Sequence, residues 1–263
     1  MVVETYVDRA RERVTAEREA VDAKHEAFGA FADRVAELPT EQSPARGVTA
    51  TVTATGARFR ADVSTDDGCR AVRRAFAETV RPHSVADEDG GEPLLATVRK
   101  EFTDAIAVAL APTTGTTFSA GLERSLVAEV DARRAEIATT SRALDRERSQ
   151  LADAAAAVDG ITAWIADADE TPLTDLGFEA LSRRHRTLAT HRERCEELAH
   201  ERQTFLRGTT SRSAEARVGH RSLVGYLYRD FPVEHPVLAT AARLDAVCAE
   251  CQRAVRDHLV RRA

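Results

Sequence analysis

The stretch 122–165, LERSLVAEVDARRAEIATTSRALDRERSQLADAAAAVDGITAWI, decides the fold. Apolar residues recur in it at every seventh position, and the chain has no proline from Thr113 to Thr171. The recurring residues are Val130, Ile137, Leu144, Leu151, Val158 and Ile165. A proline-free repeat of this kind is typical of a long α-helix whose apolar seam packs on another helix. The pattern predicts a helix over 119–168, about 75 Å long at about 1.5 Å per residue.

A second set of seam positions on this helix is apolar only at its two ends. The apolar ends are formed by Leu122, Leu126 and Val127, and by Ile161, Trp164 and Ile165. The positions between them are Arg133, Thr140, Glu147 and Ala154. Because charged side chains are rarely buried, we expect the middle of the helix to lie exposed to water.

The rest of the chain predicts further helices around this one. They cover residues 3–38, 65–80, 93–111, 175–207 and 237–261. Pro172 ends the long helix, so residues 119–207 should form an antiparallel hairpin. Its return helix spans only about 50 Å, and the short helices 65–80 and 93–111 should therefore cover the start of the long one.

These elements predict an all-α fold, an elongated helical bundle with a coiled-coil arm, in one domain over 1–263. The last helix should pack on the hairpin or on the first helix. Linkers are expected at 39–63 and 208–221. Within the first linker, Val and Thr alternate with Ala over 45–63, which fits either a small β-hairpin or a disordered loop.

The composition of the chain indicates which classes of protein it can belong to. The N-terminus lacks the apolar core of a signal peptide, and no run of about 18 apolar residues exists, so we expect a soluble cytoplasmic protein without membrane contact. Its four cysteines should be reduced thiols. The chain has two lysines and thirty-five arginines with a net charge of −6, a balance that suggests a salt-adapted, GC-rich source.

Several segments resemble an uncharacterised haloarchaeal family of soluble, mostly helical, coiled-coil-like proteins. They are AVRRAFAETV (71–80), EPLL (92–95), IAVAL (106–110), TPLTDLGFEAL (171–181) and YLYRDFPVEHPVLA (226–239). The resemblance covers most of the chain outside the linkers. It implies a helical fold, and because that family has no assigned activity it implies no catalytic residues.

The motif Cys248-Ala-Glu-Cys251 has three interpretations. Two thiols one helical turn apart can bind a metal, with His258 as a third ligand, or can exchange electrons as a dithiol. Both cysteines also fall on the apolar seam of the last predicted helix, where small thiols pack well. Core packing is the favoured interpretation, with the metal or thiol site as an alternative.

The region 183–221 is basic, with ten arginines and five glutamates. Arginines that neutralise phosphates would give nucleic-acid binding that does not depend on sequence. The candidate contacts are Arg183, Arg184, Arg186, Arg192 and Arg194. Glutamates at helical spacing from these arginines favour a solvated, ion-paired face instead.

Catalytic motifs are absent from the sequence: it has no GxSxG elbow, no phosphate-binding Walker loop and no GxGxxG turn. We expect no enzyme and no cofactor. The leading hypothesis is a helical interaction or scaffold protein that acts through coiled-coil-type packing, as a homodimer or with another helical protein. Nucleic-acid binding through 183–221 is the alternative.

Overall fold

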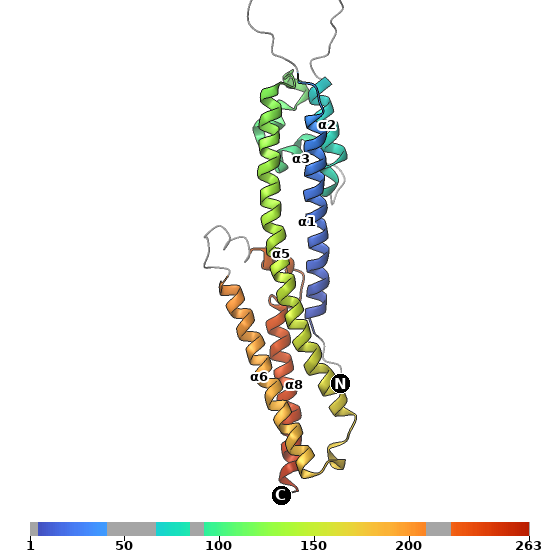
Figure 1. Cartoon of the computed structure of the whole chain (residues 1–263), viewed down its shortest axis with the longest axis vertical. Coiled ribbons are helices and arrows are strands. Elements are labelled where there is room, and N and C mark those ends of the chain that lie inside the picture. Colours follow the sequence, from blue (N-terminus) through green and yellow to red (C-terminus); the bar gives the residue numbers. More distant parts are fainter. Residues whose placement is uncertain (1–4, 41–66, 85–91, 209–221, 263) are drawn as a thin grey trace, which may run out of the picture. The chain divides into compact units, whose positions relative to one another are not determined.

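A computed structural model describes residues 5–40, 67–84, 92–208 and 222–262 (Figure 1). This part of the chain is all-α, as predicted, and contains no strand element. Its α-helices are α1 (Val7–Ala36), α2 (Asp67–Glu78), α3 (Leu94–Glu101), α4 (Asp104–Ala109), α5 (Ala120–Asp169), α6 (Phe178–Gly208) and α8 (Pro236–Val260). Short 3-10 helices lie at η1 (Arg81–His83), η2 (Pro112–Thr114) and η3 (Leu173–Asp175), and residues 222–227 are helical.

Two predicted segments fall outside the described residues. They are the β-hairpin or loop at 45–63 and, apart from Gly208, the linker at 208–221. None of the helices that the structure describes combines the length and the apolar character that a membrane crossing requires.

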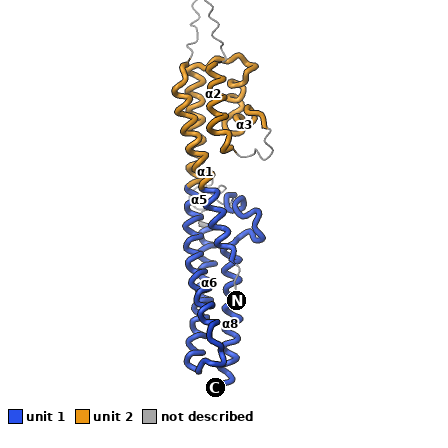
Figure 2. The backbone as a smooth tube through the Cα atoms, turned by 90° about the vertical axis from the view of Figure 1, so that its right-hand side faces the viewer, with its two compact units in different colours: residues 1–18, 142–263 blue, residues 19–141 orange. Residues whose placement is uncertain are grey.

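The chain divides into two compact units (Figure 2). Unit 1 comprises residues 1–18 and 142–263, and unit 2 comprises residues 19–141. The helices α1 and α5 each contribute one segment to each unit. The single helical domain over 1–263 stays a prediction.

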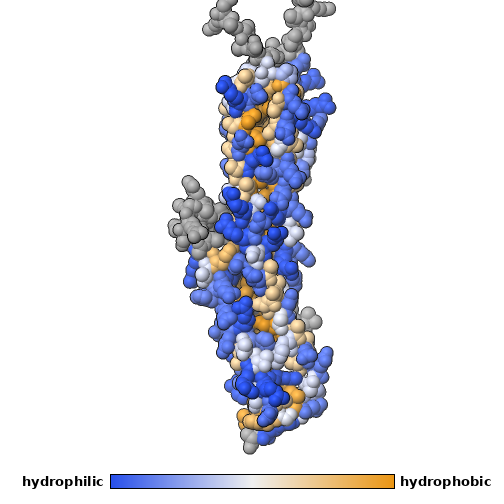
Figure 3. Space-filling view, viewed as in Figure 1, coloured by the Kyte–Doolittle hydropathy of each residue, from blue (hydrophilic) through white to orange (hydrophobic). Residues whose placement is uncertain are grey.

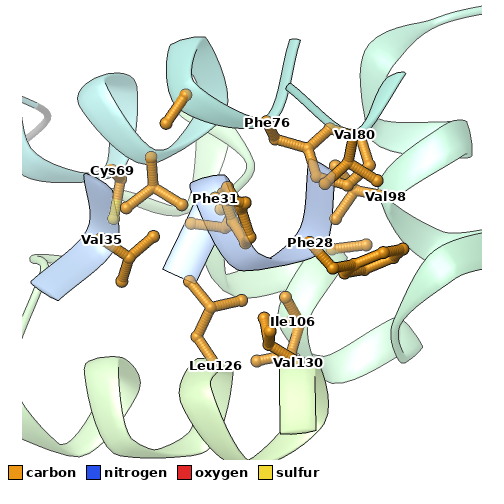
Figure 4. Packing of buried hydrophobic residues seen from close by; sticks show 14 of the residues in the cluster. Phe28, Phe31, Val35, Cys69, Phe76, Val80, Val98, Ile106, Leu126 and Val130 are labelled. Atoms are coloured by element: carbon orange, nitrogen blue, oxygen red, sulfur yellow. The ribbon is translucent and has the colours of Figure 1, made fainter. Parts of the chain in front are cut away.

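The core of unit 2 surrounds the first turns of α5. Its buried residues include Phe28 and Phe31 from α1 and Phe76 from α2 (Figure 4). Leu126 and Val130 of α5 are buried against them, together with residues of α3 and α4. The prediction that the short helices cover the start of the long helix is therefore confirmed, and α1 supplies further aromatic cover.

The segment predicted as one helix over 93–111 forms two helices. The hydroxyl of Thr103 accepts a hydrogen bond from the backbone N–H of Ile106 at 3.4 Å and so caps the start of α4. A side-chain oxygen at this position satisfies a backbone donor that a helix start leaves unpaired. The break places Ile106 and Leu110 in the core of unit 2.

Two basic side chains of unit 2 bond the same carboxylate. Glu101, at the end of α3, accepts a hydrogen bond from Lys24 of α1 at 2.7 Å and from Arg133 of α5 at 3.1 Å. Only 7% of Glu101 is exposed. The expectation that the middle of the long helix lies in water is therefore wrong at Arg133, which is partly buried by its ion pair.

Unit 1 contains the predicted helical hairpin. The end of α5, the turn that holds η3, and α6 form an antiparallel pair, and α8 packs antiparallel to α6 (Figure 1). Leu188 and Cys195 of α6 are buried, as are Cys248 and Val255 of α8. The packing of the last helix on the hairpin is thus confirmed.

Candidate functional site

A fully buried carboxylate lies in the middle of unit 1. Glu147 of α5 is 0% exposed and accepts two hydrogen bonds from the guanidinium of Arg202 of α6, at 2.7 and 2.9 Å. The hydroxyl of Tyr228 donates to the same carboxylate at 2.6 Å. We call these three residues the Glu147 network. Glu147 was expected in the exposed middle of the helix, and that expectation is wrong because Arg202 and Tyr228 take the place of water.

All three side chains of the Glu147 network are buried, and both Arg202 and Tyr228 bond the carboxylate. Burial raises the pKa of the Tyr228 hydroxyl above its ordinary value, and the negative charge of Glu147 raises it further. The phenol therefore stays protonated and acts as a donor. Arg202 also lies over the ring of Phe205, 5.3 Å from its centre. These contacts hold α5, α6 and the segment around Tyr228 together.

The sequence carried a signal for this network. In α6, Leu181, Leu188, Cys195 and Arg202 recur at a spacing of seven, and Glu147 is one of the second seam positions of α5. Opposite charges at seam positions of two antiparallel helices are a pattern that can predict a buried ion pair.

The two cysteines of the C-x-x-C motif lie in different environments. Cys248 is 0% exposed, whereas Cys251 is partly exposed. Burial, followed by the neighbouring Cys195, raises the pKa of the Cys248 thiol to about 12, and burial raises the pKa of Cys195 to about 11. Such thiols stay protonated near neutral pH, and a protonated thiol is a weak nucleophile.

His258, the third residue proposed for a metal, is partly exposed on α8. Within residues 5–40, 67–84, 92–208 and 222–262, no group of three or more metal-binding side chains gathers closely enough to hold an ion. The metal or thiol site at Cys248 and Cys251 stays a prediction, which thiol chemistry can test.

We expect Ellman's reagent to label one thiol per native chain quickly, at Cys251, because Cys69, Cys195 and Cys248 are buried. Burial, with the carboxylates of Asp169 and Glu250, raises the pKa of Cys251, so its labelling rate should rise with pH. Absorbance at the thionitrobenzoate band measures both the number of thiols that react quickly and their labelling rate. A Cys251→Ser variant should lose the fast phase. In the unfolded chain, all four thiols should react with the reagent. A fast phase that appears only after a chelator is added would instead support a bound metal.

All five arginines that were proposed to contact a nucleic acid have bonding partners within unit 1. Three of them form ion pairs with carboxylates. These are Arg183–Glu179 at 3.7 Å, Arg192–Asp245 at 2.8 Å and Arg194–Glu197 at 3.1 Å. The carboxylate of Asp245 raises the pKa of Arg192, and this pair connects α6 to α8. These ion pairs neutralise much of the positive charge that a phosphate would need.

The remaining two arginines of this set bond backbone carbonyl groups. Arg184 donates to the carbonyl of Thr171 at 3.2 Å, across the turn between α5 and α6. Arg186 donates to the carbonyl of Ser182 at 3.4 Å on its own helix. The two side chains therefore bond different parts of the unit.

An apolar groove opens where α5, α6 and α8 meet near the turn. Its volume is about 370 Å³. It is lined by Trp164, Ile165, Ala168, Asp169, Thr171, Pro172, Leu173, Arg184, Leu188, Glu250, Cys251, Ala254 and Val255. We call it the α5–α8 groove. Trp164 and Ile165, from the apolar end that the sequence places at 161–165, supply one of its walls, and Pro172 ends that wall because proline cannot continue the helix.

The rim of the α5–α8 groove is acidic on two helices. Asp169 is the last residue of α5, and Glu250 lies on the facing side of α8. Both carboxylates line the groove together with Cys251, and both raise the pKa of its thiol. Arg184 is the one cationic side chain among the lining residues, and it is bonded to the turn.

Two large apolar side chains are exposed at the same end of unit 1. Phe178, the first residue of α6, is 56% exposed, and Val260, the last residue of α8, is 73% exposed. Arg262 donates to the carbonyl groups of Thr174 and Leu176, which fastens the end of α8 to the turn. Apolar residues therefore reach the surface here among hydrophilic ones (Figure 3).

Comparison with known protein families identifies one family that the chain matches. A family model described as a domain of unknown function (DUF7260) matches residues 5–252. No curated protein and no solved structure matches the chain.

Proposed function

The chain belongs to the family of the domain of unknown function DUF7260, and on that premise we propose that it is a non-enzymatic interaction protein that binds a helical partner at the α5–α8 groove. The observation that carries this proposal is an apolar groove at the junction of three helices. Trp164, Leu188 and Val255 come from these three helices and line it. An amphipathic helix that lays its apolar face into such a groove is a common mode of recognition.

The polar chemistry of unit 1 supports a binding role over catalysis. The Glu147 network pairs its own charges among buried side chains, and the thiols of Cys195 and Cys248 are buried. Reactive sites instead place perturbed groups in an accessible cleft. The coiled-coil interaction protein, either as a homodimer or with a second helical protein, is therefore favoured over an enzyme.

Nucleic-acid binding is the weaker alternative. Three of its five arginines already pair with carboxylates of the same unit. A phosphate would have to compete with these acids for each guanidinium.

Site-specific photo-crosslinking of the full chain tests the proposed function. We expect a benzoylphenylalanine at position 254, on the wall of the groove, to give a light-dependent adduct in cells of the source organism. The matched control replaces Ala246, which is also an exposed alanine of α8 but does not line the groove. Mass spectrometry of the adduct identifies a second copy or another helical protein. No adduct at position 254, or equal adducts at both positions, would contradict the proposal.

A further inference from the structure

We propose that His191 makes the packing of α6 on α5 sensitive to protons, so that unit 1 loses stability when this imidazole takes up a proton. The observation that carries this proposal is a buried nitrogen without a partner. The Nε2 atom of His191 is buried and forms no hydrogen bond within the part of the chain that the structure describes. His191 does not line the α5–α8 groove, so this sensitivity is independent of the proposed partner.

His191 lies where α6 packs on α5. Its ring centre is 4.9 Å from the nearer ring centre of Trp164 on α5, and the two rings are tilted by 57°. Both side chains are only partly exposed. A neutral imidazole can leave one nitrogen without a proton, as an acceptor, whereas an imidazolium carries an N–H on both nitrogens. Protonation would therefore place an N–H and a positive charge in an interface that offers this N–H no acceptor.

The charged side chains of α6 around His191 do not provide that acceptor. Glu193 is exposed and lies two residues from His191, a spacing at which the side chains of a helix do not face each other. The basic residues nearest to His191 along α6 bond other groups. They are Arg184 with the carbonyl of Thr171, Arg192 with Asp245, and Arg194 with Glu197.

The acids of the two neighbouring helices do not compensate either. On α8, Asp245 bonds Arg192, and Glu250 and Asp257 are exposed. The acids of α5 around Trp164 are all exposed, and they are Asp153, Asp159, Asp167 and Asp169. Burial therefore lowers the pKa of His191 from its ordinary value, without a carboxylate that raises it.

The loss of stability should occupy a defined range of pH. In the unfolded chain a histidine has a pKa of about 6.5. Above this pH His191 is neutral in both states, and its contact with Trp164 stabilises the fold in full. As the pH falls from 6.5 to the lower pKa of the folded chain, the unfolded chain binds more protons and the free energy of unfolding decreases. Below that lower pKa both states are protonated, and the decrease due to His191 ends.

Urea unfolding of the full chain at pH 7.5 and pH 5.5 tests this sensitivity. We expect the ratio of folded to unfolded chain to fall about threefold more between these two pH values in the unaltered protein than in His191→Leu, because leucine packs on Trp164 and takes up no proton. The matched control, His200→Gln, removes an exposed histidine of the same helix and should keep the full loss. The fluorescence of Trp164, the only tryptophan of the chain, follows each transition.

The contact between the two rings gives a second measurement that needs no unfolding. A protonated imidazole quenches the fluorescence of a neighbouring indole more strongly than a neutral one does. We expect the emission of Trp164 in the folded chain to decrease in one step as the pH falls, with a midpoint below 6.5, because Trp164 touches His191. His191→Leu should lack this step, and His200→Gln should keep it.

Three results would overturn the proposal. The first is a fluorescence midpoint at or above pH 6.5, which would mean that the Trp164 ring attracts the imidazolium at least as strongly as burial disfavours it. The second is an emission that does not change with pH. The third is an equal loss of stability in the unaltered chain and in His191→Leu. If His191→Leu does not fold, the fluorescence midpoint of the unaltered chain still decides the question.

Discussion

Replacing Glu147 with leucine is expected to lower the free energy of unfolding of unit 1 by about 3–5 kcal/mol. The change leaves the guanidinium of Arg202, only 3% exposed, without its carboxylate, and it leaves the hydroxyl of Tyr228 without its acceptor. A buried charge without a partner cannot regain the water that it lost on folding. Chemical denaturation followed by fluorescence measures the effect, because Trp164 and all three tyrosines belong to unit 1.

Removing the whole network should restore most of the free energy of unfolding that Glu147→Leu loses. In the triple variant Glu147→Leu/Arg202→Met/Tyr228→Phe, apolar groups of similar size replace the buried ion pair and the hydroxyl that bonds it. As a matched control, Arg183→Ala removes an exposed ion pair with Glu179 and should leave the transition where it is. A Glu147→Leu chain as stable as the unaltered one, or a triple variant no more stable than the single one, would contradict this account.

Replacing Phe76 with alanine is expected to destabilise unit 2 by about 3–5 kcal/mol. Phe76 is 0% exposed and lies in the core beside Phe31 (Figure 4). Its ring centre is 5.7 Å from those of both Phe31 and Phe102. Its loss would remove apolar area, leave a cavity and remove two aromatic contacts. The helical signal in far-UV circular dichroism measures the change, since unit 2 contains neither tryptophan nor tyrosine.

Two further variants of unit 2 separate cavity formation from other effects. Phe76→Leu keeps most of the volume and should cost less than about 1.5 kcal/mol. Val108→Ala shortens a side chain of α4 that is 52% exposed, and should leave the transition nearly unchanged. The explanation fails if Val108→Ala is as harmful as Phe76→Ala.

Local sequence patterns predicted the helices because their causes are local. The seven-residue repeat, the absence of proline over 113–171 and the turn at Pro172 gave the long helix and its hairpin partner, with α5 at Ala120–Asp169 and α6 at Phe178–Gly208. The break between α3 and α4 was missed. Its signal is the hydroxyl of Thr103, three residues before Ile106, and the apolar stripe on both sides of it concealed the cap.

The prediction of an exposed middle for the long helix failed for a different reason. It treated Arg133 and Glu147 as isolated charges, for which burial is costly. In the folded chain Glu101 pairs with Arg133, and Arg202 pairs with Glu147, from segments 32 and 55 residues away. A repeat within one helix cannot show which charge another helix will bring to it.

The sequence by itself determined that the chain is helical, where its long helices begin and end, and that α5 turns back at Pro172, because periodicity and backbone chemistry act over a few residues. Only the tertiary structure decided which charges are buried, that Cys248 lies in the core while Cys251 is partly exposed, and that Trp164, Leu188 and Val255 line one groove. Burial depends on which surfaces of distant segments meet, and no single stretch of sequence contains that information.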